Sequence, residues 1–265
     1  MVADVDELRL LCYRVVTTRM TPTERLRTFQ RRVLAWYRVH HRKLPWRKTR
    51  DPYKILVSEI MLQQTQVERV IPKYHEFLKR YPTLPTLAEA RTAELRKVWY
   101  PLGYNIRPLR LRQIARRALR EHHGRIPDSY DGLLAMEGVG RYTAGAVLSF
   151  AFNKDAPILD TNVTRLLSRY FGVWGPGGRM RRRPPAARSP RGAGRAGGVE
   201  KQLWALAEQV IPPGRGYEIN QAMMDFGATM CTARAPRCQA CALRRGCRSF
   251  PWHEPKTRSG RARAD

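Results

Sequence analysis

The stretch Glu137-Gly-Val-Gly-Arg-Tyr-Thr-Ala-Gly145, EGVGRYTAG, places two glycines one residue apart, directly before an apolar run. A short helical pattern over 130–136 precedes the turn, and a second one over 142–152 follows it. A Gly-x-Gly turn between two helices leaves backbone N–H groups at a helix N-terminus without a side chain to block a close approach, which suits a phosphate group. An isolated turn of this kind usually only joins two helices, but the charge of the chain and Arg141 favour contact with a DNA backbone.

The net charge of the chain indicates a polyanionic partner. Lys and Arg number 50 against 22 Asp and Glu among 265 residues, which gives a formal charge of +28. This excess predicts binding to nucleic acid. A membrane surface is the alternative, but no apolar run approaches the roughly 20 residues of a spanning helix, and no secretory signal opens the chain. We therefore expect a soluble cytoplasmic protein, associated with the nucleoid if the source is bacterial.

Four of the five cysteines lie close together near the end of the chain, in the spacing C-x6-C-x2-C-x5-C: Cys231, Cys238, Cys241 and Cys247. In an intracellular protein such a group is expected to bind a metal rather than to form disulfides. Four thiolates suit either a zinc ion or an iron–sulfur cluster. Zinc sites favour two short C-x2-4-C pairs, and only one pair is that short here, so the spacing favours a cluster without excluding zinc.

Hydrophobic periodicity predicts helices along nearly the whole chain and no strands, hence an all-α fold. The predicted helices cover 23–41, 53–64, 109–121, 130–136, 142–152, 161–171, 201–210 and 220–230. Capping boxes that begin at Thr65 and Thr86 are expected to open two more. The segment 175–198 contains seven arginines, many glycines and prolines and no acid, so it is predicted to be a disordered insertion, as is the tail 254–265.

Glu59 is a candidate general acid. On a helix it shares a face with Ile55, Leu56 and Leu62. Burial among apolar side chains raises the pKa of a carboxyl group and keeps its proton available near neutral pH, as a general acid requires. The plainer alternative is a buried glutamate that is only hydrogen-bonded or paired with an arginine.

Asp160 directly precedes the helix predicted over 161–171, the position of an ordinary N-cap. The dipole and the free N–H groups of a helix start also favour the ionised form of a carboxyl group. We therefore expect Asp160 to be an anion that can face a developing cation, a role compatible with capping.

Several motifs together resemble the helix-hairpin-helix DNA glycosylases of the endonuclease III-like superfamily, specifically the MutY-type adenine DNA glycosylases. They are the glycine turn with its following Asp160, the run Asp51–Gln66 (DPYKILVSEIMLQQTQ), the run Asn220–Ala228 (NQAMMDFGA) and the four cysteines. The similarity covers about residues 25–250, apart from the arginine-rich insertion. These motifs are long and stand in the order of the family.

The resemblance implies two helical lobes with double-stranded DNA across the cleft between them. A six-helix barrel with the helix-hairpin-helix would cover 46–152, and a lobe with a [4Fe-4S] cluster would combine 23–45 with 153–250, including the insertion 175–198. Residues 1–22 would form an N-terminal extension and 251–265 a basic tail. The four cysteines match the cluster ligands of the family, and the protein is expected to be a monomer.

The resemblance also implies roles for single residues of the reaction centre. Glu59 and Asp160 match the two catalytic carboxylates, and Tyr142 and Asn162 match residues that support them. The implied reaction is hydrolysis of the N-glycosidic bond of adenine mispaired with G or 8-oxoguanine. Glu59 would protonate N7 of adenine, and Asp160 would stabilise the oxocarbenium ion. Tyr142 stands where relatives that also cut the strand carry a lysine nucleophile, so a monofunctional enzyme is expected.

On the expected DNA surface, Gly138 and Gly140 match the phosphate-binding hairpin of the family, where a monovalent cation can also bind, and Arg141 follows them. Gln64 and Tyr104 match residues that are wedged into the duplex around the extruded base. The target nucleotide would leave the base stack before its glycosidic bond breaks, at a cost of a few kcal/mol.

The chain also departs from the family pattern. MutY-type enzymes commonly continue past the cluster with a domain that recognises 8-oxoguanine, and this chain ends soon after Cys247, so we expect that domain to be lacking. The family's Asp-Gly-Asn is Asp160-Thr-Asn162 here, and its Gly-Tyr-Tyr is Gly103-Tyr-Asn105. Excision of thymine or uracil opposite G stays open as an alternative. A noncatalytic DNA-binding module is a third possibility, although no matched carboxylate or cysteine is missing.

Overall fold

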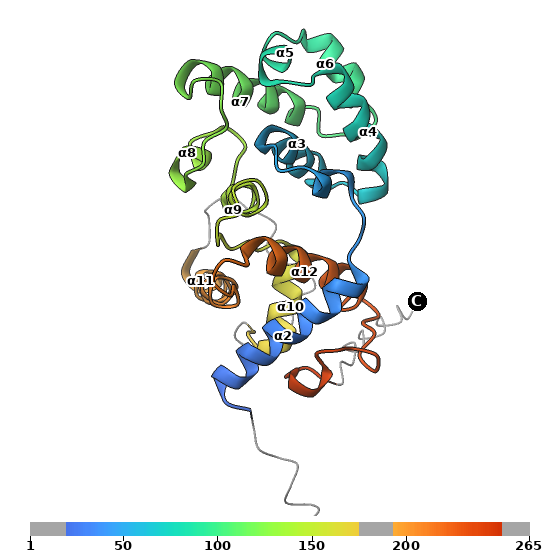
Figure 1. The fold of residues 1–265 in the computed structure, drawn as a ribbon, viewed down its shortest axis with the longest axis vertical. Coiled ribbons are helices and arrows are strands. Elements are labelled where there is room, and N and C mark those ends of the chain that lie inside the picture. Colours follow the sequence, from blue (N-terminus) through green and yellow to red (C-terminus); the bar gives the residue numbers. More distant parts are fainter. Residues whose placement is uncertain (1–19, 175–192, 251–265) are drawn as a thin grey trace, which may run out of the picture.

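The structure is a computed structural model that describes residues 20–174 and 193–250, and every regular element in these ranges is a helix. The all-α prediction is therefore confirmed for the described residues. The upper group of helices in Figure 1 comprises the 3₁₀ helix η1 (Pro45–Lys48), α3 (Pro52–Leu62), α4 (Val67–Arg80), α5 (Leu84–Ala88), α6 (Thr92–Trp99), α7 (Arg107–Glu121), α8 (Tyr130–Leu134) and α9 (Arg141–Phe150). The lower group comprises α2 (Pro22–His40), α10 (Thr161–Phe171), α11 (Ala193–Gln209), α12 (Gly216–Thr229) and the 3₁₀ helix η2 (Arg244–Gly246).

The lower group is built from segments that are far apart in sequence. Helix α2 packs against α12, and α12 also packs against α10. The chain passes to the upper group after α2 and returns after α9. Helix α9 contacts both α3 and α12, so it lies at the junction of the two groups. The chain crosses between the two groups twice, and α9 contacts helices of both groups. Residues of both groups therefore lie around the same junction.

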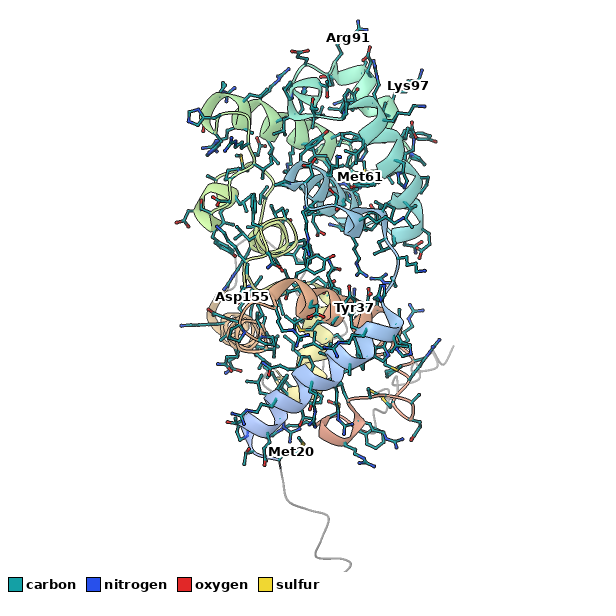
Figure 2. All side chains as sticks on the ribbon, viewed as in Figure 1. Met20, Tyr37, Met61, Arg91, Lys97 and Asp155 are labelled. Atoms are coloured by element: carbon teal, nitrogen blue, oxygen red, sulfur yellow. The ribbon has the colours of Figure 1, made fainter. Side chains whose placement is uncertain are left out.

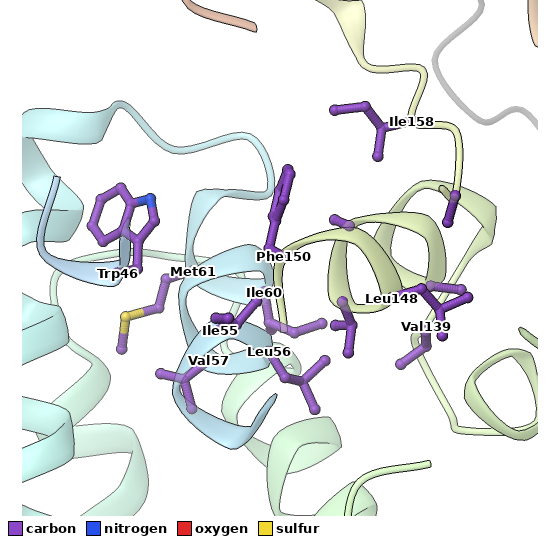
Figure 3. Close-up of a cluster of buried hydrophobic side chains, with 14 of the residues drawn as sticks. Trp46, Ile55, Leu56, Val57, Ile60, Met61, Val139, Leu148, Phe150 and Ile158 are labelled. Atoms are coloured by element: carbon purple, nitrogen blue, oxygen red, sulfur yellow. The ribbon is translucent and has the colours of Figure 1, made fainter. Parts of the chain in front are cut away.

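Helix α3 lies inside the upper group because nearly every side chain along it is apolar. A helix that is apolar all round is stable only where other elements surround it, and α3 contacts α4, α7 and α9. Figure 3 shows Leu56 and Ile60 of α3 in one cluster with Leu148 and Phe150 of α9, and all four are buried. This packing fixes α3 against the helix that follows the glycine turn.

Charged side chains cover the outside of the upper group. Figure 2 shows Met61 among the helices, whereas Arg91 and Lys97 project from the outer end of this group. Met61 is fully buried. Within the described ranges, no helix is both long enough and apolar enough to span a bilayer.

The two predicted capping boxes are wrong. Helix α4 has Gln66 at its N-cap without a side-chain hydrogen bond, because the Thr65 hydroxyl donates to Gln63 O at 3.3 Å and accepts a guanidinium N–H instead. Helix α5 begins three residues earlier than predicted, with a capping box between Thr83 and Thr86. A proline in its first turn favours this earlier start, because proline is already restricted to a helical φ.

Part of the predicted insertion is helical. Helix α11 extends from Ala193 to Gln209, so 193–198 belong to a helix that was expected only from residue 201. The rest of the insertion, 175–192, and the tail lie outside the described residues. The glycine-rich composition of 193–198 concealed the helix. These residues form its first turns, and most of its apolar residues come later in the sequence.

Asp225 on α12 attaches the first crossing of the chain to the lower group. Its carboxylate is fully buried and accepts hydrogen bonds from Nε of Arg42 at 2.6 Å and from both Nη atoms of Arg47 at 2.7 and 2.9 Å. Burial raises the pKa of Asp225, but Arg47 and Arg42 outweigh it, and the net pKa lies below the ordinary 3.8. The paired anion therefore stabilises the fold at neutral pH.

Asp225→Asn should lower the free energy of unfolding by about 3 kcal/mol at pH 7, because it leaves a buried guanidinium without its anion. Urea unfolding measures this loss. The wild-type advantage should be complete above pH 3.8 and should disappear as the pH falls through the lowered pKa of Asp225. Glu121→Gln, which removes an exposed pair with Arg117, is the control and should leave the free energy of unfolding nearly unchanged. Equal losses in both variants would contradict the prediction.

Candidate active site and DNA-binding surface

Glu59 lies on α3 with only 3% of its surface exposed, and its Oε2 atom has no hydrogen-bond partner. The pKa of Glu59 is raised to about 7, mainly by burial and also by the charge of Asp160, while Tyr142 and Arg47 act in the opposite direction. The predicted rise is therefore present. At neutral pH a large fraction of Glu59 carries a proton that it can donate.

Tyr142 lies in the first turn of α9 and faces both carboxylates. Its hydroxyl donates to Sδ of Met224 on α12 at 3.5 Å. Burial and the charges of Glu59 and Asp160 raise the pKa of Tyr142 well above 10, so the residue stays a neutral phenol. Tyr142 thus connects α3, α9 and α12 at one point between the two groups of helices.

Asp160 is the N-cap of α10. Its Oδ1 accepts the N–H of Val163 at 2.7 Å, and its Oδ2 accepts Nδ2 of Asn162 at 3.1 Å. The expected pKa direction is wrong: burial raises the pKa of Asp160 above 3.8, although Val163, Asn162 and Arg165 oppose the rise. Desolvation outweighs the helix start because the carboxylate lies in the junction rather than at the surface.

The two carboxylates nevertheless differ in a way that separates their roles. Asp160 is half-buried and accepts two hydrogen bonds that favour its anion, whereas Glu59 is almost fully buried and Oε2 accepts none. A single proton shared by the pair is therefore more stable on Glu59 than on Asp160. The hydrogen bonds thus favour the proton on Glu59 and the negative charge on Asp160.

Two glycines allow the backbones around the site to come this close. A Cβ at Gly145 of α9 would lie 2.2 Å from Pro157 O, in the segment that leads to Asp160. A Cβ at Gly227 of α12 would lie 2.8 Å from both Cβ and O of Asn162. Glycine inside a helix is costly unless packing requires it. These two positions bring the start of α10 against α9 and α12.

Arg165 was not recognised from the sequence, although it supports Asn162. Its Nη2 donates to Asn162 Oδ1 at 2.7 Å and to Gly227 O at 2.6 Å, and its Nε donates to Cys231 O at 2.7 Å. Because the guanidinium occupies Oδ1, the amide of Asn162 must present Nδ2 to Asp160. An arginine three residues after Asn162, on the buried face of α10, was the available signal.

Gln221 is a second residue that was missed. It lies on α12 one turn before Met224, is 2% exposed, and its Oε1 atom has no hydrogen-bond partner. Buried amide oxygens are normally hydrogen-bonded. An unpartnered acceptor one turn from a residue that contacts Tyr142 is therefore a candidate ligand-binding group.

The glycine turn has the geometry that the sequence indicated. Gly138 has a φ of +80°, and a Cβ there would lie 2.6 Å from Cδ of Arg110. Gly140 is the N-cap of α9 without a side-chain cap, and a Cβ there would meet nothing within 4 Å. The first backbone bond of α9 runs from Ala144 N to Gly140 O, so the preceding N–H groups belong to the open first turn. Phosphate binding there stays a prediction.

Arg141 is exposed, and its guanidinium lies over the ring of Trp204 on α11, 3.9 Å from the ring centre. This stacking holds Arg141 beside the open turn of α9 by a cation–π contact. The planar group keeps its N–H edge available, because stacking uses only its face. A role of Arg141 in DNA binding also stays a prediction.

Gln64 and Tyr104 lie side by side although 40 residues separate them. The Tyr104 hydroxyl donates to Gln64 Oε1 at 2.6 Å, and 56% of the Tyr104 surface is exposed. Both residues have positive φ values, +57° for Gln64 and +50° for Tyr104. The structure thus brings the two predicted wedge residues together on one exposed surface.

The four cysteines line one hollow together with Arg169 and Leu243. Nη1 of Arg169 lies 3.5 Å from Sγ of Cys231, and Leu243 N donates to Sγ of Cys241 at 3.4 Å. Across the described ranges, no three His, Cys, Asp or Glu side chains are arranged to hold a single metal ion. Four thiols around one hollow can supply the ligands of a metal site.

The helical fold, the open glycine turn and the paired carboxylates together define a protein of the helix-hairpin-helix DNA-repair class. The chain belongs to the HhH-GPD superfamily of base excision DNA repair proteins, whose profile matches residues 57–183. The matched range includes the glycine turn and both carboxylates.

Relatives within this superfamily carry two kinds of name. An adenine DNA glycosylase from Buchnera aphidicola subsp. Baizongia pistaciae is 36% identical over 223 residues, 84% of this chain and 58% of that protein. A thymine/uracil-DNA glycosylase from Pyrobaculum aerophilum is 34% identical over 219 residues, 81% of this chain and 88% of that protein. The solved structure of a thermostable thymine-DNA glycosylase superposes with a TM-score of 0.74 at 31% identity, covering 86% of this chain and 97% of that one. The chain thus spans little more than half the length of the adenine-specific relative.

Proposed function

We propose that the protein is a monofunctional DNA glycosylase that hydrolyses the N-glycosidic bond of adenine mispaired with G or 8-oxoguanine. The observation that carries the proposal is the pair of Glu59, which burial gives a pKa of about 7, and Asp160, which accepts hydrogen bonds from Val163 and Asn162 that favour its anion. Glycoside hydrolysis needs two carboxyl groups in these two states. The open glycine turn and the net charge of +28 supply the affinity for duplex DNA.

In the proposed mechanism, Glu59 donates its proton to N7 of the extruded adenine. The electron pair of the C1′–N9 bond moves to the base, which leaves as neutral adenine, and positive charge develops on the sugar. The Asp160 anion stabilises this charge, and a water molecule then adds to C1′ and returns a proton to Glu59. Tyr142 has no amine, so no Schiff base can form at its position. Covalent trapping by borohydride at the level of a strand-cutting glycosylase would contradict this assignment.

We also propose that Cys231, Cys238, Cys241 and Cys247 hold a [4Fe-4S] cluster, which stabilises the lower group of helices and the loop around it. Burial raises the pKa of the Cys241 thiol to about 12 and that of Cys247 to about 11. A bound metal would keep these sulfur atoms as thiolates. The cluster would be supported by four mol of iron per mol of monomeric protein and by absorbance at about 400 nm. A colourless protein loaded with zinc would refute it. We also propose that a monovalent cation binds at the Gly138–Gly140 turn.

The choice of adenine follows the similarity to adenine DNA glycosylases, and it is supported by Gln221. Its unpartnered Oε1 is an acceptor, and the exocyclic N6 amino group of adenine is a donor, whereas thymine and uracil present the O4 acceptor at the corresponding edge. A buried acceptor facing O4 would cost binding energy. Thymine or uracil opposite G is the second candidate, because the two similar thymine-specific proteins are covered almost over their whole length.

Single-turnover excision from matched duplexes with A:8-oxoguanine, A:G, T:G and U:G pairs tests the proposal. We expect release of adenine from the first two duplexes to be faster than release of thymine or uracil from the others. Faster release of thymine or uracil would select the second candidate. No release from any of the four duplexes by the cluster-loaded protein would refute the glycosylase proposal.

The rate of adenine excision should depend on pH through Glu59. Its pKa of about 7 means that the proton is present below this pH and is lost above it. The single-turnover rate constant should therefore fall by roughly tenfold per pH unit above neutrality, and it should also fall at low pH once Asp160 is protonated. A rate constant that stays level between about pH 6 and 9 would contradict the role of Glu59 as the acid.

A further inference from the structure

Arg107, at the start of α7, is a buried cation that binds both loops of the Gln64–Tyr104 pair. Only 3% of its surface is exposed. Its two Nη atoms donate to the carbonyls of Ile60, Met61, Gln63, Leu102 and Gly103 and to Oγ1 of Thr65, at 2.6–3.1 Å. Within the described ranges, no carboxylate forms an ion pair with it. Backbone dipoles therefore replace a counter-ion, with the C-terminal end of α3 among them.

The acceptors of Arg107 stand next to Gln64 and Tyr104, two of the four non-glycine residues with positive φ in the described ranges. Gln63 and Thr65 flank Gln64, and Gly103 directly precedes Tyr104. Non-glycine residues with φ near +50° persist only where the surrounding structure holds them there. One guanidinium thus fixes both sides of Gln64 and the near side of Tyr104.

Aromatic contacts add to this arrangement. The guanidinium carbon of Arg107 lies 5.2 Å from the ring centre of Trp99, which is buried, and 5.2 Å from that of Tyr104, which is exposed. The Tyr104 ring therefore contacts the cation, and its hydroxyl group is bound by Gln64. Lysine cannot replace these contacts, because its ammonium group is neither planar nor able to reach all six acceptors.

We propose that Arg107 is a positioning residue that preforms Gln64 and Tyr104 as one wedge before DNA binds. The proposal rests on the proposed glycosylase function. A wedge that is already ordered loses little conformational freedom when it replaces a base in the stack, so extrusion of the target nucleotide costs less. Arg107 itself is buried, so we expect it to contact no phosphate and to contribute nothing to counter-ion release.

The test uses the full, cluster-loaded chain with Arg107→Lys. The duplex carries a non-hydrolysable 2′-fluoro-adenosine opposite 8-oxoguanine and a neighbouring 2-aminopurine, whose fluorescence rises when the target leaves the stack. We expect Arg107→Lys to lower the extruded fraction and, on the hydrolysable duplex, the excision rate by about 10- to 100-fold. Excision from a bulge in which the adenine is already unstacked should fall much less. The slope of log K against log salt should not change.

Arg112→Lys is the matched control, because Arg112 lies on the same helix and donates to Ala90 O at 2.8 Å and Thr92 Oγ1 at 3.0 Å, away from the wedge. It should leave extrusion unchanged. A double-mutant cycle adds Tyr104→Ala, in whose presence Arg107→Lys should have little further effect. Each of the following results would overturn the proposal. The loss of excision could be equal on bulged and paired substrates, or equal in Arg112→Lys. The two substitutions of the cycle could act independently, or the Arg107→Lys variant could fail to fold. Fluorescence reports extrusion without excision, so a failure of the glycosylase proposal remains distinguishable.

Discussion

Glu59→Gln should lower the single-turnover rate constant for adenine excision by between about 10²- and 10⁴-fold. Glutamine fills the same volume on α3 and can donate a hydrogen bond, but it cannot transfer a proton to the leaving base. Without protonation adenine would have to leave as an anion. Glu59 is almost fully buried without a hydrogen bond at Oε2, so removing its charge should not lower the stability of the fold.

The measurement is quenched single-turnover excision from an A:8-oxoguanine duplex at neutral pH, together with binding of the 2′-fluoro-adenosine duplex. Binding should stay close to that of the wild type, so the loss is confined to the chemical step. Glu89→Gln, at an exposed position after α5, is the control and should keep its full rate. A Glu59→Gln variant that excises adenine as fast as this control would end the assignment of Glu59 as the acid.

Asp160→Asn should lower the same rate constant by about 10²- to 10³-fold, because it removes the negative charge that faces the developing oxocarbenium ion. Asparagine is as good an N-cap as aspartate, so α10 should keep its hydrogen bond from Val163 N–H. The variant should also bind DNA at least as tightly, since one anion near the phosphates is lost. The effect on catalysis is therefore separable from an effect on folding.

Asp51→Asn provides a closely matched control for this experiment. Asp51 is the N-cap of α3 and accepts N–H bonds from Tyr53 and Lys54 through its Oδ1 atom, as Asp160 does from Val163. Asp51 does not contribute to the pKa shift of Glu59. If Asp51→Asn and Asp160→Asn lose activity to the same small degree, then Asp160 is only a cap.

The two carboxyl variants also answer a question that the pKa directions raise. Burial raises the pKa of both Glu59 and Asp160, so the two pKa directions by themselves do not determine which carboxyl group holds the proton. The hydrogen bonds from Val163 and Asn162 decide in favour of an anionic Asp160. A loss of the high-pH limb of the rate profile in Glu59→Gln, with the limb kept in Asp160→Asn, is the expected pattern.

Local patterns predicted the features whose causes are local. The glycine turn, the helix that follows it and the N-cap at Asp160 are all present where the sequence indicated them, because each depends on a few neighbouring residues. The helical class was predictable for the same reason, since amphipathic periodicity reports which face of a segment is buried. The capping box at Thr65 failed because a distant group competed, since Thr65 accepts a hydrogen bond from Arg107.

Contacts between distant segments could not be read in this way. The environment of Asp160 depends on α9 and α12, which approach through Gly145 and Gly227, and this approach turned an expected fall in pKa into a rise. Arg165 and Arg107 belong to no motif that the sequence analysis identified, and Gln221 lies in the run 220–228 without a role assigned to it there. The importance of Arg165 and Arg107 lies in the distant backbone atoms that they bind, and that of Gln221 in an oxygen without a partner.

Residue order alone thus specified the helices, the open turn, the apolar face around Glu59 and the spacing of the four thiols, because side-chain periodicity and backbone preference act within a few residues. Only the packed chain decided which carboxyl group keeps the proton, how Gln64 and Tyr104 come to touch, and which arginine holds them. Desolvation and hydrogen-bond geometry depend on everything within a few ångströms in space, and that neighbourhood exists only after α3, α9, α10 and α12 have come together.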